Sequence, residues 1–405
     1  MRKDGFTKKA KILLYCTLTV VMVLLCAVGI SAAQGPKAQD GEFTVGIIGP
    51  LSGTAKVWGQ GIVRGVEMAA EEINAKGGVR VAGKNYKIKI KAYDDKYKGS
   101  EGATAANNLI FKDNVKFIFG SIATTSILAF QVITEPNKVL CHINGYFKGS
   151  LSPEKPFSFR VIQTSHEYTV PLIAALIKQR PQLKTYATIA RNDANGNSVT
   201  NDFVTATGSK LKLLKSEYFA AGTEDFYPML TRLKSENPDL IMSCALPPGD
   251  IAKILKQARQ LGIKSVFLGH SGAVEKPSEF ISVAEKENLK DFYYGVDFNP
   301  GSADPKVVAF TKRYQEKYGE ICYGYVDPCY YDAMNALAYA IEKMNSFDTE
   351  KIKDFYETKI GNLPGVMGPL RFTGKEYYGI AHQRVTSCYL ATFEDGKQKI
   401  IERVQ

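Results

Sequence analysis

Apolar residues recur along positions 43–143 in two alternating patterns. Residues 43–49 form a short continuous apolar run, and residues 61–76 place apolar side chains at the three- and four-residue spacing of a helix with one buried face. Further strands are expected at 86–92, 115–120 and 139–143, with helices at 103–112 and after Thr124 or Thr125. Short apolar strands that alternate with helices are typical of a parallel sheet covered on both faces.

The same order of elements begins again after residue 159. Strands are expected at 185–190, 240–244, 266–268 and 293–298, helices at 168–179, 198–211, 226–235, 250–261, 305–318 and 330–344, and a strand-and-turn tail from 368 onwards. The chain is too long for one ordinary core, so the repeated order predicts two α/β lobes. No low-complexity linker separates them, which predicts short connections and a ligand site in the cleft between the lobes.

Residues 1–33 have the pattern of an export signal. Five basic residues and one acidic residue precede an apolar run at 12–30, and Ser31, Ala32 and Ala33 offer small side chains for cleavage. The apolar run also approaches the roughly 20 residues of a membrane span, so a retained anchor is the alternative. We expect cleavage after Ala33 and a periplasmic mature protein.

Charge and histidine content exclude several classes of function. The formal net charge is +11, and removal of the leader's five positive charges and one negative charge leaves +7. Basic residues are interleaved with acids and form no stripe with aromatic residues, so nucleic-acid binding is not expected. The four histidines are widely separated and no CxxC pair occurs, so neither a metal site nor a cofactor is expected.

Five cysteines follow the leader, an odd number that leaves one thiol unpaired in an oxidising compartment. Cys322 and Cys329 flank a short loop and are the candidate disulfide, with a reduced pair as the alternative. Cys141 and Cys244 lie in apolar strand-like runs, where cysteine is commonly a small core residue.

Candidate ligand residues follow the carboxyl ends of the expected strands, where ligands bind in doubly wound sheets. These loops carry Ser52, Gly53 and Trp58 after the first strand, residues 121–126 and 144–146 in the first half, and residues 191–195, 245–247 and 270–272 in the second half. The hydroxyls of Thr124 and Thr125 at a helix start suit a carboxylate, with plain helix capping as the alternative. Trp58 is the only tryptophan, and its position in an expected loop leaves both ligand contact and packing open.

Signatures of catalysis are weak in this sequence. Gly59, Gly61 and Gly65 resemble a loose dinucleotide-binding motif, but eight residues separate Pro50 from Gly59, whereas that motif needs its glycines directly after the strand. The run at 269–272 is not a nucleophile elbow, and no phosphate-binding loop occurs. We therefore expect no enzyme, with a nucleotide-dependent dehydrogenase as the disfavoured alternative.

A set of motifs in chain order carries a family resemblance. The stretches GIIGPLSG, WGQG, AAEEINAKGGV, YDD, FIFGS, PNKVL, FSFR, DFYPMLTRLK, ILKQARQLG, YDAMNALAYAI and MGPLRF together resemble the periplasmic solute-binding proteins of branched-chain amino-acid-type ABC transporters over residues 43–400. Each stretch is weak evidence alone, and the ordered set is specific.

This resemblance implies the type I periplasmic binding protein fold, an α/β fold of two Rossmann-like doubly wound lobes joined by three crossover strands. It implies a first lobe of 42–162 and 297–366, and a second lobe of 163–296 and 367–405. It further implies a monomer without catalytic activity that closes on a small-molecule ligand by a hinge and delivers it to membrane permease subunits. A ligand-sensing receptor subunit is a second possibility from the same resemblance.

The resemblance also implies a set of ligand-binding residues, namely Trp58, Ile122, Ala123, Thr124, Asn144, Tyr146, Asn195, Leu246 and Ser271. Trp58 matches an aromatic residue placed over the ligand, and Thr124 matches a hydroxyl donor to the ligand carboxylate. Tyr97 and Ala123 occupy the expected positions of the family's disulfide, which is absent.

The departures from the family pattern bear on the ligand. Residues 144–146 replace small residues that complete carboxylate binding, and Asn195 replaces an aromatic residue. Ser271 stands where amino-acid binders place the acid that pairs with the α-ammonium, and Ser165 falls near a second such acid.

A buried ammonium without a carboxylate partner is costly. We therefore expect a small carboxylate that lacks an amino group, an organic or aromatic acid that fits Thr124, Trp58, Tyr146 and the basic Arg191. Alternatively, Glu167 or Asp193 supplies the missing charge and the ligand is a branched-chain or other amino acid.

Overall fold

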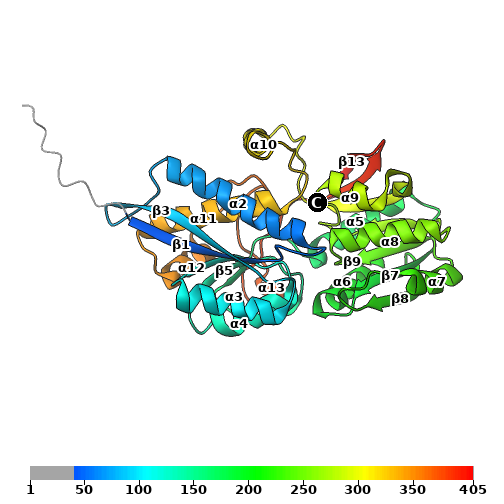
Figure 1. Ribbon diagram of the computed structural model, residues 1–405, viewed down its shortest axis with the longest axis horizontal. Helices are drawn as coiled ribbons and strands as arrows, with labels where there is room; N and C mark the ends of the chain where they lie inside the picture. The colour runs from blue at the N-terminus through cyan, green and yellow to red at the C-terminus, as the bar shows by residue number, and fades with distance from the viewer. Residues whose placement is uncertain (1–40, 405) are drawn as a thin grey trace, which may run out of the picture. The chain divides into compact units, whose positions relative to one another are not determined.

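The computed structural model describes residues 41–404, so the expected leader at 1–33 lies outside the described residues. Two sheets, each covered by helices, make up this part of the chain (Figure 1). Within residues 41–404, none of the helices combines the length and the apolar character that a membrane span requires.

The first sheet has six strands in the order β2-β3-β1-β4-β5-β6. Its strands are β1 (Gly41–Gly49), β2 (Val79–Val81), β3 (Lys84–Asp94), β4 (Phe117–Gly120), β5 (Leu140–Ile143) and β6 (Ser158–Arg160). All neighbours are parallel except β2 and β3, which form an antiparallel pair at one edge. Strands β4 to β6 are buried along their whole length, as expected for a sheet covered on both faces.

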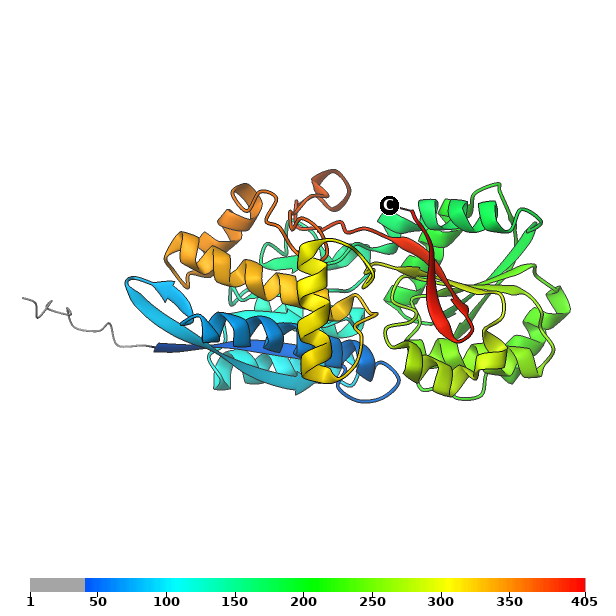
Figure 2. The same cartoon turned by 90° about the horizontal axis from the view of Figure 1, so that it is seen from above.

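Helices from two distant parts of the chain accompany this sheet and form the first lobe with it. The nearby ones are α2 (Lys56–Ala75), α3 (Gly99–Asn107) with a π-helical turn at Asn108–Lys112, and α4 (Thr124–Thr134), and the later ones are α10 (Pro305–Tyr318), α11 (Val326–Met344), α12 (Thr349–Thr358) and the short α13 (Lys375–Tyr378). Helix α11 lies beside α2 (Figures 1 and 2). Gly65 allows this approach, because a Cβ there would lie 2.2 Å from the carbonyl oxygen of Asp327.

The second sheet has seven strands in the order β13-β12-β11-β10-β9-β7-β8 and forms the second lobe with its helices. The strands are β7 (Thr185–Arg191), β8 (Lys212–Phe219), β9 (Leu240–Cys244), β10 (Val266–Gly269), β11 (Phe292–Val296), β12 (Tyr389–Glu394) and β13 (Lys397–Arg403), and the helices are α5 (Ser165–Gln179), α6 (Ala194–Thr207), α7 (Tyr227–Glu236), α8 (Pro248–Gln260) and α9 (Pro277–Ala284). Strands β12 and β13 add antiparallel to a parallel core.

Three short segments connect the lobes, after β6, after β11 and before β12. Gln163 of the first segment contacts one residue of each of the other two. Its amide donates to Asp297 Oδ1 at 2.8 Å and to the Ser387 carbonyl at 3.3 Å. Two doubly wound lobes joined by three crossovers confirm the expected fold class. The stretch before Ser387 still bonds to the first lobe, since Arg160 N–H donates to the His382 carbonyl at 2.8 Å. We therefore propose a lobe boundary near Ser387 instead of residue 367.

Several elements differ from the expectations. Helix α2 begins at Lys56 and contains Trp58, which was expected in a loop. Strand β8 was not expected, because it is a sheet edge with several exposed or half-exposed polar residues and lacks an apolar run. The strand expected to begin at 368 is only an isolated bridge between Leu363 and Leu370.

The expected disulfide between Cys322 and Cys329 is wrong in this structure, where both thiols are free. Cys329 lies in the first turn of α11 and donates from Sγ to the Val161 carbonyl at 3.1 Å, whereas Cys322 contacts the Gly324 carbonyl at 3.5 Å. The two side chains thus have separate buried partners.

Candidate ligand cleft between the two lobes

Loops at the carboxyl ends of strands in both sheets enclose a small cavity between the lobes. Its lining consists of Trp58, Tyr97, Ile122, Asn144, Tyr146, Asn195, Ala245, His270 and Tyr325. The structure therefore brings together five residues singled out from the sequence, which are Trp58, Ile122, Asn144, Tyr146 and Asn195. Four others, Ala123, Thr124, Leu246 and Ser271, do not line this cavity.

The start of helix α4 places Thr124 beside the cavity. Ala123 is the N-cap residue of this helix, and no side chain forms a capping hydrogen bond there. The Thr124 hydroxyl therefore does not cap the helix. Thr124 is 1% exposed and its Oγ1 has no hydrogen-bond partner among the described residues. If Gly145 carried a Cβ, that atom would lie 3.0 Å from Thr124 Oγ1. Gly145 stands in the chain between the lining residues Asn144 and Tyr146, so the hydroxyl is close to them. An unpaired buried hydroxyl costs about 1–3 kcal/mol, which a ligand acceptor would recover.

The second lobe contributes the start of helix α6. Asn195 is buried there, and its Oδ1 has no partner among the described residues. Arg191, at the end of β7, is only 8% exposed, and its guanidinium lies 4.8 Å from the ring centroid of Tyr97 in the first lobe. Its nearest described carboxylate oxygen, on Asp193, is 3.9 Å away, and Asp193 also caps α6 by accepting from the Gly196 N–H at 2.8 Å. Arg191 thus places a positive charge close to the cleft.

Hydrogen bonds cross directly from one lobe to the other around the cavity. Trp58 Nε1 donates to the Gly272 carbonyl at 3.3 Å, and the Tyr146 hydroxyl donates to the Ser271 carbonyl at 3.2 Å. Glu275 of the second lobe accepts from the Val326 N–H at 3.4 Å, at the start of α11. These contacts hold the lobes closed.

His270 sits on the second-lobe side of the cavity. Its ring faces Trp58 and Tyr146 with centroid distances of 6.4 Å and 6.3 Å, and Nε2 contacts the Leu246 carbonyl at 2.9 Å. Burial lowers the pKa of His270, and the two carbonyls at its nitrogens oppose that effect only in part. The ring is therefore an uncharged lining group at neutral pH.

Leu246 and Ser271 lie one residue beyond the lining positions Ala245 and His270. Leu246 is fully buried in the second lobe's core. Ser271 Oγ donates to Asp297 at the point where the three connections meet. Both residues hold the cleft's framework and do not face its cavity.

The two acids considered as ammonium partners are bonded elsewhere. Glu167 forms a capping box with Thr164 at the start of α5 and accepts from the Tyr378 hydroxyl at 3.0 Å. Asp193 caps α6, as described above. Since the nine lining residues include neither Asp nor Glu, the cavity offers a ligand aromatic rings, amides and hydroxyls.

The cavity itself has a volume of about 10 Å³, which is room for roughly one water molecule. A ligand with a ring or a branched chain fits only when the lobes separate or the aromatic side chains turn. The sequence did not indicate Tyr97 and Tyr325 as lining residues. Tyr97 follows the Asp94–Asp95 pair at the end of β3, and Tyr325 precedes α11, far along the chain.

Comparisons with known proteins agree with this geometry. A family model described as periplasmic binding protein matches residues 42–398. The Leu/Ile/Val-binding protein homolog 7 of Brucella abortus is 25% identical over 353 residues, covering 81% of this chain and 84% of that protein. A leucine binding protein from Thermotoga maritima superposes with a TM-score of 0.78 at 24% identity, covering 89% of this chain and 98% of that one. A solute binding protein from R. palustris in complex with benzoate gives a TM-score of 0.77 at 18% identity, covering 90% and 96%.

Proposed function

The chain belongs to the periplasmic binding protein family, and from this premise we propose that it captures a small carboxylate without an amino group by closing its two lobes. It then delivers the ligand to the permease of an ABC importer. The similar solved structures include one described as a leucine binding protein and one in complex with benzoate, so the fold alone does not choose between these ligand classes.

The composition of the cavity lining carries the choice of ligand. Aromatic rings of Trp58, Tyr97, Tyr146 and Tyr325 surround it, with Ile122 as an apolar neighbour. Flat rings suit an aromatic or branched ligand body. An α-ammonium would need a buried carboxylate partner, and no described lining residue supplies one.

The anionic end of the ligand has donors on both lobes. The Thr124 hydroxyl is buried at the start of α4 and has no partner in the described part of the chain, and the free N–H groups and dipole of a helix start favour an anion. Arg191 adds a buried positive charge from the other lobe. A ligand that contacts both groups stabilises the closed form, because only contacts present in that form shift the equilibrium toward it.

Pairs of ligands that differ only in the amino group test the proposal. We expect 3-phenylpropionate and 4-methylpentanoate to raise the melting temperature of the purified mature chain, since binding to the folded state alone stabilises it by mass action. Phenylalanine and leucine, which add only the α-ammonium, are expected to give no shift. The reverse result, with amino acids binding and the matched acids silent, would replace this proposal by amino-acid capture.

Export and delivery need separate tests. Intact-mass measurement of the periplasmic protein is expected to show a chain beginning at Gln34, and a retained leader in the membrane fraction would favour the anchor. A deletion strain is expected to lose uptake of the acid that binds. Normal uptake with a lost cellular response would favour the receptor alternative.

A further inference from the structure

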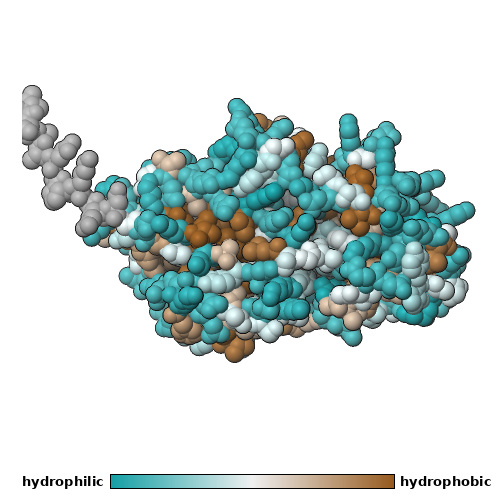
Figure 3. Space-filling model, in the orientation of Figure 1, coloured by the Kyte–Doolittle hydropathy of each residue, from teal (hydrophilic) through white to brown (hydrophobic). Residues whose placement is uncertain are grey.

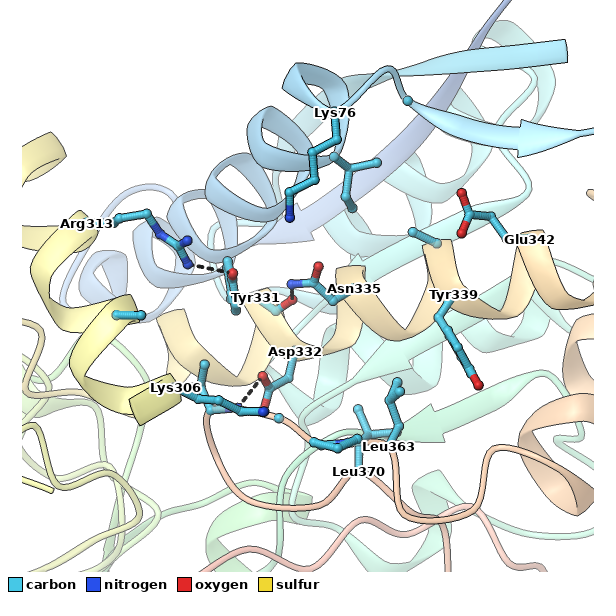
Figure 4. A pocket seen from close by; sticks show the side chains of 17 residues that line it. Lys76, Lys306, Arg313, Tyr331, Asp332, Asn335, Tyr339, Glu342, Leu363 and Leu370 are labelled. Carbon is cyan, nitrogen blue, oxygen red and sulfur yellow. Dashed lines mark hydrogen bonds between the residues drawn. The ribbon is translucent and has the colours of Figure 1, made fainter. Parts of the chain in front are cut away.

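A second, larger cavity opens on the first lobe, away from the cleft. It has a volume of about 550 Å³ and lies between α2, α10, α11 and the loop that carries Leu363 to Leu370 (Figure 4). This volume falls within the roughly 300–1,000 Å³ of small-molecule sites. None of its lining residues lines the cleft cavity, so closure of the lobes is not needed to form it.

The walls of this cavity are largely apolar. They include Ile73 of α2, Ala309 of α10, Ala338 of α11, and Leu363, Val366 and Leu370 of the loop. Figure 3 shows brown, hydrophobic residues gathered on this face over α2 and α11. Such a surface, accessible from solvent, favours a ligand with an apolar body.

The acids that line the cavity already have partners. Asp332 is 4% exposed and accepts from the Val366 and Met367 N–H groups at 2.7 and 2.9 Å and from the Arg384 guanidinium at 2.7 Å. Glu342 accepts from the Arg80 N–H at 3.2 Å. Arg384 balances the charge of Asp332, whereas Glu342 keeps its negative charge, because a backbone N–H is a neutral donor.

Two of the three lining cations have no carboxylate partner within the described part of the chain. Arg313 is bonded to Glu72 at 2.8 Å and to the Tyr331 hydroxyl at 2.7 Å. By contrast, Lys76 and Lys306 form no ion pair with any residue in the range 41–404, and Figure 4 shows their side chains reaching toward the cavity from the end of α2 and from α10. The site thus combines an apolar wall with two ammonium groups that form no described ion pair, and they outnumber the one carboxylate in the same position, that of Glu342.

We propose that this cavity is a second binding site, independent of the cleft, for an organic anion with an apolar body, such as a medium-chain or aromatic carboxylate. The ligand's apolar part would cover Ala338 and Leu370, and its carboxylate would pair with Lys76 or with Lys306. The charges on both lysines set the sign of the ligand, and the apolar walls exclude small inorganic anions as good ligands.

The test uses the mature chain and the fluorescent anion anilinonaphthalene sulfonate as the probe. We expect the double variant K76Q/K306Q to bind the probe about tenfold more weakly, because the substitutions remove the charge-assisted hydrogen bonds to its sulfonate. Ala309→Trp, which fills the cavity from an exposed helix position, is expected to abolish the signal. Lys312→Gln is the matched control, since Lys312 lies on the same helix with 75% of its side chain exposed.

Competition separates this site from the cleft. Octanoate is expected to displace the probe from the wild type and to bind K76Q/K306Q more weakly, whereas octanol is not expected to displace the probe. Unchanged probe affinity in K76Q/K306Q, or equal displacement by octanol, would overturn the proposal. An octanoate affinity that is the same in the wild type and in K76Q/K306Q would place the displaced probe outside this cavity and also overturn the proposal.

Discussion

The hydroxyl of Thr124 is the first-lobe side chain that we propose as a donor to the ligand carboxylate. It is buried and has no hydrogen-bond partner within residues 41–404, so Thr124→Val removes a ligand donor without stranding a protein partner. We expect the affinity for the carboxylate to fall by about 1.5–3 kcal/mol, the range for a hydrogen bond to a charged group. The melting temperature of the free protein is expected to stay the same or rise. Calorimetric titration and thermal denaturation measure the two quantities.

The matched control is Thr134→Val, at the far end of the same helix and also buried. It is expected to leave ligand affinity unchanged. Equal loss of affinity in both variants would show that α4 responds to any change of this kind, and the anion site would then lie elsewhere.

At this scale the sequence predicts loops better than individual side chains. Residues that follow buried strands were expected near the ligand because parallel strands end at one edge of a sheet, and Asn144, Tyr146 and Asn195 do line the cavity. Ala245 and His270 line it in place of Leu246 and Ser271, since the direction of a side chain in a loop depends on local backbone geometry that has no periodicity. Tyr325 belongs to a helix start that only the crossover topology brings to the cleft.

At the scale of elements, the start of helix α11 receives a cap from the other lobe. Its own N-cap residue, Tyr325, makes no side-chain cap, and the Glu275 carboxylate accepts from the Val326 N–H at 3.4 Å. Glu275→Ala is expected to weaken closure and lower ligand affinity by about 1 kcal/mol, the typical value of a helix cap. Glu275→Gln, which keeps an acceptor oxygen, is expected to bind nearly as wild type.

Small-angle scattering of the unliganded protein and titration of the ligand measure this effect. The radius of gyration is expected to increase in Glu275→Ala alone. Glu279→Ala is the control, because that side chain lies in the following helix and is 42% exposed. A compact Glu275→Ala protein with full affinity would rule out a role of this cap in closure.

Element boundaries were hardest to predict where glycines serve close packing. Helix α2 was expected to begin at residue 61, where apolar side chains start to recur at helical spacing, but it begins at Lys56 and so contains Gly59 and Gly61. The structure explains them: a Cβ on Gly59 would lie 2.0 Å from the Pro50 carbonyl oxygen, and one on Gly61 would meet Asp327. The buried strands β4, β5 and β9 were predicted within two residues, since continuous apolar runs follow directly from burial on both faces.

At the scale of the whole molecule, the three connections between the lobes meet at one buried carboxyl group. Asp297 is 3% exposed, accepts from Gln163 and Ser271, and has the Cys388 thiol as a further neighbour. Burial raises its pKa to about 6, against an ordinary value of 3.8. Because the folded form binds the proton more tightly than the unfolded form, stability from this group is fully present below about pH 4 and is lost as the pH rises through about 6.

Asp297→Asn should therefore remove part of the protein's pH dependence. The wild type is expected to lose about 2–3 kcal/mol of unfolding free energy from this group between about pH 4 and about pH 7, whereas the variant keeps a neutral acceptor throughout. Denaturant unfolding of both proteins across this range measures the difference. Asp395→Asn, in the exposed turn between β12 and β13, is the control and should follow the wild type. Parallel pH profiles for all three proteins would contradict this prediction. They would mean that the Asp297 carboxyl keeps one charge state over the whole range, so that its titration does not contribute to the stability of the folded protein.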